Sequence, residues 1–108
     1  METGTKTIGT KKGKLTEFFE TRGWCQGHYA LNADGEQTKA ISGEAVAWCL
    51  LGGIDAVRAT PKERGWLKVA IHNEISKSIY GGRNVIEWND KKGRTKDEIM
   101  ALLANAGV

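Results

Sequence analysis

The sequence lacks the features of membrane and exported proteins. No apolar run reaches the ~20 residues that cross a bilayer, and Met1 and Ile8 are the only large apolar side chains before Leu15, so the apolar core of a signal peptide is missing. Only two cysteines are present, and without a signal peptide we interpret Cys25 and Cys49 as free buried thiols rather than as a disulfide. We therefore expect a cytoplasmic protein with no membrane association.

The motifs of common enzyme classes are also missing. The glycine pairs Gly52-Gly53 and Gly81-Gly82 lack the G-x-x-x-x-G-K-[ST] and G-x-G-x-x-G spacings that place several backbone amides on a phosphate. We interpret them as packing and helix-ending glycines. A nucleophilic Cys/His pair would need an open, electropositive pocket to hold a thiolate, and no pattern in the sequence indicates one. We expect a non-enzymatic protein without a cofactor.

The net charge of +3 is confined to the N-terminal segment. Against one acidic residue, residues 1–14 carry four lysines, Lys6, Lys11, Lys12 and Lys14. The other residues carry twelve basic and twelve acidic side chains, so that part of the chain is formally neutral. We interpret residues 1–14, rich in Gly, Thr and Lys, as a flexible basic tail and residues 15–108 as a single domain.

A long, evenly apolar stretch predicts the centre of the fold. Residues 45–53 read A-V-A-W-C-L-L-G-G and contain no charge, which is typical of a helix buried on every side. Ser42 is a suitable N-cap, and we expect the helix to continue to about Ala59. Because a glycine costs a helix about 1 kcal/mol relative to alanine, Gly52 and Gly53 indicate that another backbone packs closely there.

Sequence signals at helix ends predict the remaining elements. A first helix over Lys14–Arg22 ends at Gly23, and residues 24–41 form a loop or small hairpin that turns at Asn32–Gly35. The capping boxes T-P-K-E at Thr60 and T-K-D-E at Thr95 each start a helix.

The helix from Thr60 presents Leu67, Ile71, Ile75 and Ile79 and ends at Gly81-Gly82, and the helix from Thr95 ends at Gly107. Residues 84–88 alternate weakly and predict a short extended segment. The fold class is therefore mainly α: a single small domain of about four helices packed around a buried central helix, with at most a short β-hairpin or extended segment.

The four tryptophans, Trp24, Trp48, Trp66 and Trp88, fall in four different segments. Core anchoring explains such a spread best, but an exposed tryptophan would be a natural hot spot for a partner protein. The segment W-N-D-K-K-G-R at residues 88–94 is the strongest surface candidate, although we favour its interpretation as a solvated turn. The partner-binding candidates are Trp24, His28, Trp88, Asn89, Asp90, Lys91, Lys92 and Arg94.

A zinc site is the one metal hypothesis that the composition permits. Cys25, His28, Cys49 and His72 are all the Cys and His residues of the chain, and a Cys₂His₂ set can close a tetrahedral zinc site. Only Cys25 and His28 have metal-like spacing, and the set matches no zinc ribbon or finger. We therefore favour buried thiols and predict no metal, with a zinc-stabilised module as an alternative.

Three segments carry a resemblance to a known family: G-W-C-Q-G at residues 23–27, A-V-A-W-C-L-L-G at residues 45–52, and W-N-D at residues 88–90. With the helix start at Thr95, they resemble an uncharacterised family, a domain of unknown function, of small bacterial and bacteriophage proteins. The likeness covers residues from Leu15 to the C-terminus. It implies a cytoplasmic accessory protein of a phage or another mobile element and brings no catalytic residue.

Two classes of function are compatible with these observations. The first is a non-enzymatic accessory protein that binds another protein. The second is a nucleic-acid-associated protein that contacts phosphates through the tail lysines Lys6, Lys11, Lys12 and Lys14 and through residues 91–96. We favour the first, because the folded part is neutral and no pattern for base readout is present.

Overall fold

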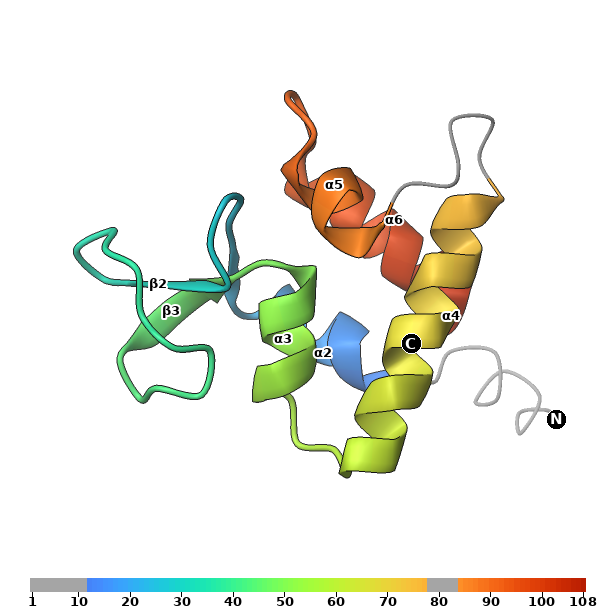
Figure 1. Cartoon of the computed structure of the whole chain (residues 1–108), viewed down its shortest axis with the longest axis horizontal. Coiled ribbons are helices and arrows are strands. Elements are labelled where there is room, and N and C mark those ends of the chain that lie inside the picture. Colours follow the sequence, from blue (N-terminus) through green and yellow to red (C-terminus); the bar gives the residue numbers. More distant parts are fainter. Residues whose placement is uncertain (1–11, 78–83) are drawn as a thin grey trace, which may run out of the picture.

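A computed structural model describes residues 12–77 and 84–108. In chain order, the described residues form α2 (Lys14–Glu20), β1 (Gly23–Trp24), β2 (Ala30–Asn32), β3 (Ala45–Trp48), α3 (Leu50–Ala56), α4 (Pro61–Ser76), α5 (Val85–Asp90) and α6 (Lys96–Ala106). The sheet and its loops lie on one side, α4, α5 and α6 on the other, and α2 and α3 between them (Figure 1). A small fold with more helix than strand is therefore confirmed.

Helices α2, α4 and α6 enclose the largest part of the apolar core together with α3. Leu15, Phe19, Ile71, Ile99 and Leu103 are completely buried in it. These residues recur every three or four positions along their helices, which places them on one face of each. The core is continuous from α2 to α6 because each helix turns its apolar face toward the others.

Both predicted capping boxes are present. The Thr60 side chain accepts a hydrogen bond from the Glu63 backbone N–H at 3.1 Å, and the Glu63 carboxylate accepts one from the Thr60 N–H at 2.9 Å. Thr95 and Glu98 repeat this arrangement at the start of α6. Gly107 ends α6 in the left-handed conformation, with φ of 75°, as predicted. Helix α4 is described to Ser76, and the predicted end at Gly81-Gly82, like Ile79, lies outside the described residues.

The prediction of one central helix over Ala45–Ala59 is wrong. Residues 45–48 form strand β3, Cys49 is an N-cap, and the helix that follows, α3, has seven residues. Strand β3 occupies the middle of the sheet, parallel to β1 and antiparallel to β2. An apolar run suits a central strand as well as a buried helix, and Val46 is 50% exposed, so this run is not covered on every side.

The segment between β1 and β3 contains the predicted small hairpin. The Asn32 side-chain oxygen accepts hydrogen bonds from the backbone N–H groups of Asp34 and Glu36, and Gly35 supplies the positive φ that the turn needs. The return arm pairs at Leu31 and Gln37. Ser42 bonds the Glu44 N–H in a turn before β3, so it does not cap a helix.

Residues 85–88 are helical, and the prediction of an extended segment over residues 84–88 is wrong. Asn84 is the N-cap of α5, and its Oδ1 accepts a hydrogen bond from the Glu87 N–H at 2.8 Å. Val85 and Asn89, one helical turn apart, are the residues of α5 that are buried. The weak alternation of the sequence was outweighed by this cap and by the burial of one helix face.

Glycines set the closest contacts in the fold. A Cβ on Gly52 would lie 1.9 Å from the Tyr29 carbonyl oxygen, and one on Gly53 would lie 2.5 Å from the Phe19 ring. The prediction that another backbone packs closely here is therefore confirmed at Gly52, whereas Gly53 packs against a side chain. Gly23 does not cap α2, which ends at Glu20; it opens β1, where a Cβ would lie 2.8 Å from the Val46 carbonyl oxygen.

Candidate functional site

Asn89, at the end of α5, joins three parts of the fold. Its side chain is 1% exposed, and it is the buried polar residue of the described chain. Its Oδ1 accepts hydrogen bonds from the Trp24 indole Nε1 at 2.8 Å and from the Leu50 backbone N–H at 3.0 Å. A buried amide is stable only when its donors and acceptors are paired, so this residue fixes α5 against β1 and α3.

The loop after β1 completes the same network. Asn89 Nδ2 donates to the Cys25 carbonyl at 3.1 Å and to Asp90 Oδ1 at 2.9 Å. The Gly27 backbone N–H donates to Asp90 Oδ1 at 3.0 Å, and Gln26 Nε2 donates to the Asn89 carbonyl at 2.9 Å. The three segments noted in the sequence, residues 23–27, 45–52 and 88–90, therefore meet at Asn89.

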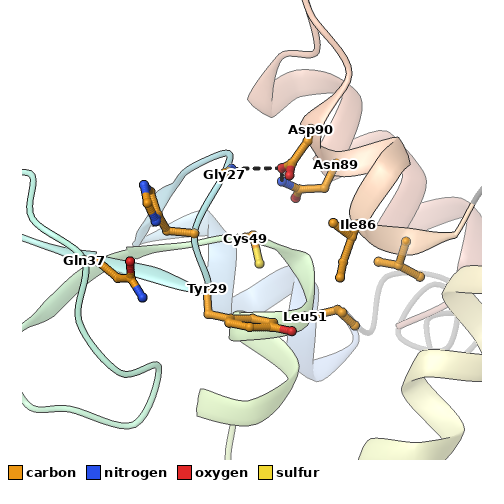
Figure 2. A pocket seen from close by; sticks show the side chains of 10 residues that line it. Gly27, Tyr29, Gln37, Cys49, Leu51, Ile86, Asn89 and Asp90 are labelled. Atoms are coloured by element: carbon orange, nitrogen blue, oxygen red, sulfur yellow. Dashed lines mark hydrogen bonds between the residues drawn. The ribbon is translucent and has the colours of Figure 1, made fainter.

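A cavity of about 380 Å³ lies beside this junction, between the loop after β1, the start of α3 and α5. Tyr29, Leu51 and Ile86 surround Cys49, and Asp90 lies at the other end, bonded to Gly27 (Figure 2). Tyr29 is 51% and Ile86 44% exposed. The full lining is Gly27, His28, Tyr29, Gln37, Cys49, Leu51, Val85, Ile86, Asn89 and Asp90.

The two thiols are free and buried, as predicted. Burial, followed by the nearby Cys49 and Asp90, raises the pKa of Cys25 to about 11. Burial also raises the pKa of Cys49, whose sulfur accepts a hydrogen bond from the Gly52 N–H at 3.4 Å. Because the nucleophile is the thiolate, the raised pKa values lower the reactivity of both thiols near neutral pH.

The four residues of the zinc hypothesis are not gathered into a site. Among residues 12–77 and 84–108, no group of three or more His, Cys, Asp or Glu side chains is placed to hold a metal ion. His28 is exposed in the loop before β2, and His72 is exposed on α4. Cys25 and Cys49 follow paired positions of the parallel strands β1 and β3, which brings them near each other, and Cys25 Sγ also donates to the His28 backbone carbonyl at 3.5 Å.

The structure separates the predicted partner-binding residues into groups. His28, Asn89 and Asp90 line the cavity. Trp24 is half-buried and its indole N–H is bonded to Asn89. The half-buried Trp88 is covered by Arg94, whose guanidinium lies 3.7 Å from the ring centroid and whose Nε donates to the Trp88 carbonyl.

Several of the predicted phosphate-binding cations have partners within the domain. Lys12 pairs with Glu20, and Lys14 pairs with Glu63 at 3.0 Å. Lys96 donates to the Arg22 carbonyl at 2.7 Å. Lys91 and Lys92 lie in an exposed turn after α5, and Lys6 and Lys11 lie outside the described residues. Exposed pairs of this kind are weak, so they exchange readily for other partners.

Tyr29, Gln37, Leu51, Val85 and Ile86 line the cavity but were not predicted as site residues. One signal could have found two of them: Asn84 and Glu87 have the N-cap spacing of a helix start. A helix from Asn84 places Val85 and Asn89 on one face and exposes Ile86 beside it. Tyr29, Gln37 and Leu51 come from other elements and carry no local signal.

A family model described as "Family of unknown function (DUF6197)" matches residues 15–107. The chain belongs to this family. Neither the search of curated proteins nor that of solved structures found a match. In the described part of the chain, the helices are too short or too polar to span a bilayer.

Proposed function

We propose that this member of the family is a non-enzymatic accessory protein that acts by binding another protein at the cavity beside Asn89. The observation that carries the proposal is a cavity of about 380 Å³ with two large, exposed apolar side chains, Tyr29 and Ile86, in its lining. Exposed apolar side chains beside a concave surface are typical of binding sites. A partner protein bound at the cavity would cover both of these side chains.

The Asn89 network supports this proposal because it holds the lining in place without a ligand. The Asn89 side-chain oxygen accepts from the Leu50 N–H of α3, and its nitrogen donates to the Cys25 carbonyl in the loop after β1. Asp90 Oδ1 accepts from the Gly27 N–H in the same loop. A site that is already ordered loses less conformational entropy on binding. The raised pKa values of Cys25 and Cys49 support a binding role over thiol chemistry.

We further propose that the protein works in the cytoplasm as an accessory factor of a phage or another mobile element. The support is the resemblance of residues 23–27, 45–52 and 88–90 to proteins of that origin. The nucleic-acid alternative is less well supported, because residues 15–108 are formally neutral and carry no pattern for base readout.

An affinity capture from bacterial lysate tests the proposal. The baits are the full chain, a chain without residues 1–11, and the variants Ile86→Asp and Val69→Asp, each washed at low and high salt with and without nuclease. Val69 is the matched control because it is 56% exposed and lies on α4, outside the cavity. We expect to capture a discrete protein that stays bound at high salt, after nuclease treatment and to the chain without residues 1–11. The Val69→Asp variant should still capture this protein, and the Ile86→Asp variant should not.

Two results would overturn the proposal. The first is capture of nucleic acid that depends on residues 1–11 and on low salt, as phosphate contacts require. The second is a captured protein that Ile86→Asp retains as well as the full chain does, because the cavity would then not be the site.

A further inference from the structure

The charge of the cavity lining has a single sign, which is negative. Of the described residues that line it, Asp90 is the one Asp or Glu, and none is Lys or Arg. Asp90 is exposed, so its carboxylate faces solvent at the cavity end. A ligand that fills the cavity therefore meets one fixed negative charge and otherwise neutral or apolar groups, with His28 as the remaining titratable side chain besides Tyr29 and Cys49.

The position of the Asp90 carboxylate is set by the fold. Its Oδ1 accepts from the Gly27 N–H at 3.0 Å and from Asn89 Nδ2 at 2.9 Å. The amide of Asn89 is in turn held by Trp24 and Leu50. Burial is the main cause of the raised pKa values of Cys25 and Cys49, and the negative charge of Asp90 adds to both. A carboxylate held in this way is ordered before any cation arrives.

The apolar part of the lining limits the size of the occupant. Leu51, Val85 and Ile86 line the cavity together with Tyr29. In Figure 2, Tyr29 and Leu51 lie on the side of Cys49 away from Asp90, and Ile86 lies between Leu51 and Asp90. Its volume of about 380 Å³ is near the lower end of the ~300–1,000 Å³ range of ligand pockets. This volume suits one large side chain of a partner and its immediate neighbours, but not a whole helix.

We propose that the partner presents a short segment in which a large apolar side chain enters between Tyr29 and Ile86 and an adjacent lysine or arginine pairs with Asp90. The inference rests on the proposed function and names the chemistry of its partner: a basic and apolar peptide segment. Apolar contact supplies the affinity, and the ion pair selects among apolar segments. Removal of the positive charge from the segment weakens binding about three- to tenfold.

A displayed library of short random peptides tests the inference on the full chain. The library is selected in parallel on the unchanged protein, Asp90→Asn, Asp34→Asn and Ile86→Asp. Asparagine keeps the Oδ1 acceptor for Gly27 and Asn89, so Asp90→Asn removes the charge while the network stays paired. Asp34 is an exposed aspartate in the hairpin turn, outside the cavity, and serves as the matched control.

The expected result is enrichment of peptides that combine a large apolar residue with a nearby Lys or Arg. Peptides selected on Asp90→Asn should lose the preference for Lys or Arg, and those selected on Asp34→Asn should keep it. Selection on Ile86→Asp should enrich no peptide. Fluorescence anisotropy with the most enriched peptide and its Lys→Gln form then gives a three- to tenfold difference in Kd on the unchanged protein and about none on Asp90→Asn.

The remaining outcomes separate this inference from the proposed function. Apolar peptides that need Ile86 but show no basic preference would overturn the inference and leave the cavity as a binding site. Self-association that Ile86→Asp abolishes would make a second copy of the chain the occupant and overturn the inference too. No enrichment, or enrichment indifferent to Ile86→Asp, would overturn both.

Discussion

The helical core and the Asn89 junction hold the molecule together in different ways. In the helical core, α2, α4 and α6 share many apolar contacts, and side chains such as Leu15, Ile71 and Leu103 each bury a similar amount of surface. At the junction, one amide holds the loop after β1, α3 and α5 in register. Apolar packing spreads the free energy of folding over many residues, whereas a buried polar network concentrates it in a few.

Among the variants that test this comparison, the replacement of Asn89 with leucine should cause the largest loss of stability. The variant Asn89→Leu leaves the Trp24 indole, the Leu50 N–H and the Cys25 carbonyl without their partner. At about 1–3 kcal/mol for each of these three unpaired groups, we expect a loss of about 3–9 kcal/mol in the free energy of unfolding. Urea denaturation followed by tryptophan fluorescence measures it.

The control for this variant is Asn105→Leu, because Asn105 is exposed on α6. We expect its free energy of unfolding to stay within about 0.5 kcal/mol of the unchanged protein. A similar, small effect for Asn89→Leu would show that the junction is not a concentrated source of stability.

Truncating one core side chain in the helical region has the next largest expected effect. Leu103 is completely buried on α6, and Leu103→Ala removes its contacts and leaves a void. We expect a loss of about 2–5 kcal/mol, measured by the same urea denaturation. If Leu103→Ala lost more stability than Asn89→Leu, a single residue of the helical core would matter more than the amide at the junction, which would contradict the comparison.

Two glycines sharpen the contrast, because replacing glycine with alanine should destabilise the protein at Gly52 and stabilise it at Gly65. In Gly52→Ala, the new methyl group would meet the Tyr29 carbonyl at 1.9 Å, so the hairpin must shift. We expect it to lose about 1–3 kcal/mol. Gly65, inside α4, has nothing within 4 Å of an added Cβ, so Gly65→Ala gains about 0.5–1 kcal/mol from helix propensity. Thermal unfolding of both variants checks the signs.

The smallest expected effect is a loss of stability at acidic pH that comes from the glutamates of the two capping boxes. The Thr60 backbone N–H, followed by Lys14, lowers the pKa of Glu63 from 4.5, and the Thr95 N–H does the same for Glu98. A carboxyl whose pKa is lowered on folding stabilises the fold fully above its unfolded value, and this stabilisation is lost as pH falls through the folded pKa.

The double variant Glu63→Gln, Glu98→Gln checks this dependence. Its stability should fall less steeply than that of the unchanged protein as pH drops below about 4.5, since glutamine does not titrate. Urea midpoints at several pH values from neutral to acidic measure the two slopes. Parallel slopes would contradict the prediction.

The helical core could be predicted from the sequence because its signals are local. Thr60 with Glu63 and Thr95 with Glu98 specify two helix starts within four residues each, and Gly107 specifies an end. The close approach at Gly52 was also predicted, because a glycine inside an apolar run needs a steric reason. What the local pattern could not supply was the neighbour, the Tyr29 carbonyl.

The junction could not be predicted, because its contacts are far apart in the sequence. Asn89 bonds Leu50 across 39 residues and Cys25 across 64. Read alone, the residues after Trp88 suit a solvated turn, and only the folded neighbours make Asn89 a buried amide. Strand β3 was missed for the same reason, since its pairing partners, β1 and β2, lie elsewhere in the chain.

The contact between the start of α2 and the last residue has a topological consequence. The Val108 carbonyl accepts hydrogen bonds from the backbone N–H groups of Leu15 and Thr16, at 2.8 and 3.3 Å, and a Cβ on Gly13 would clash with Val108. The domain is therefore nearly a closed ring of chain. Such a ring can be joined at Gly13 and Val108 and opened at the exposed turn by Gly35, which makes this fold a natural candidate for circular permutation and for insertion into a loop of another protein.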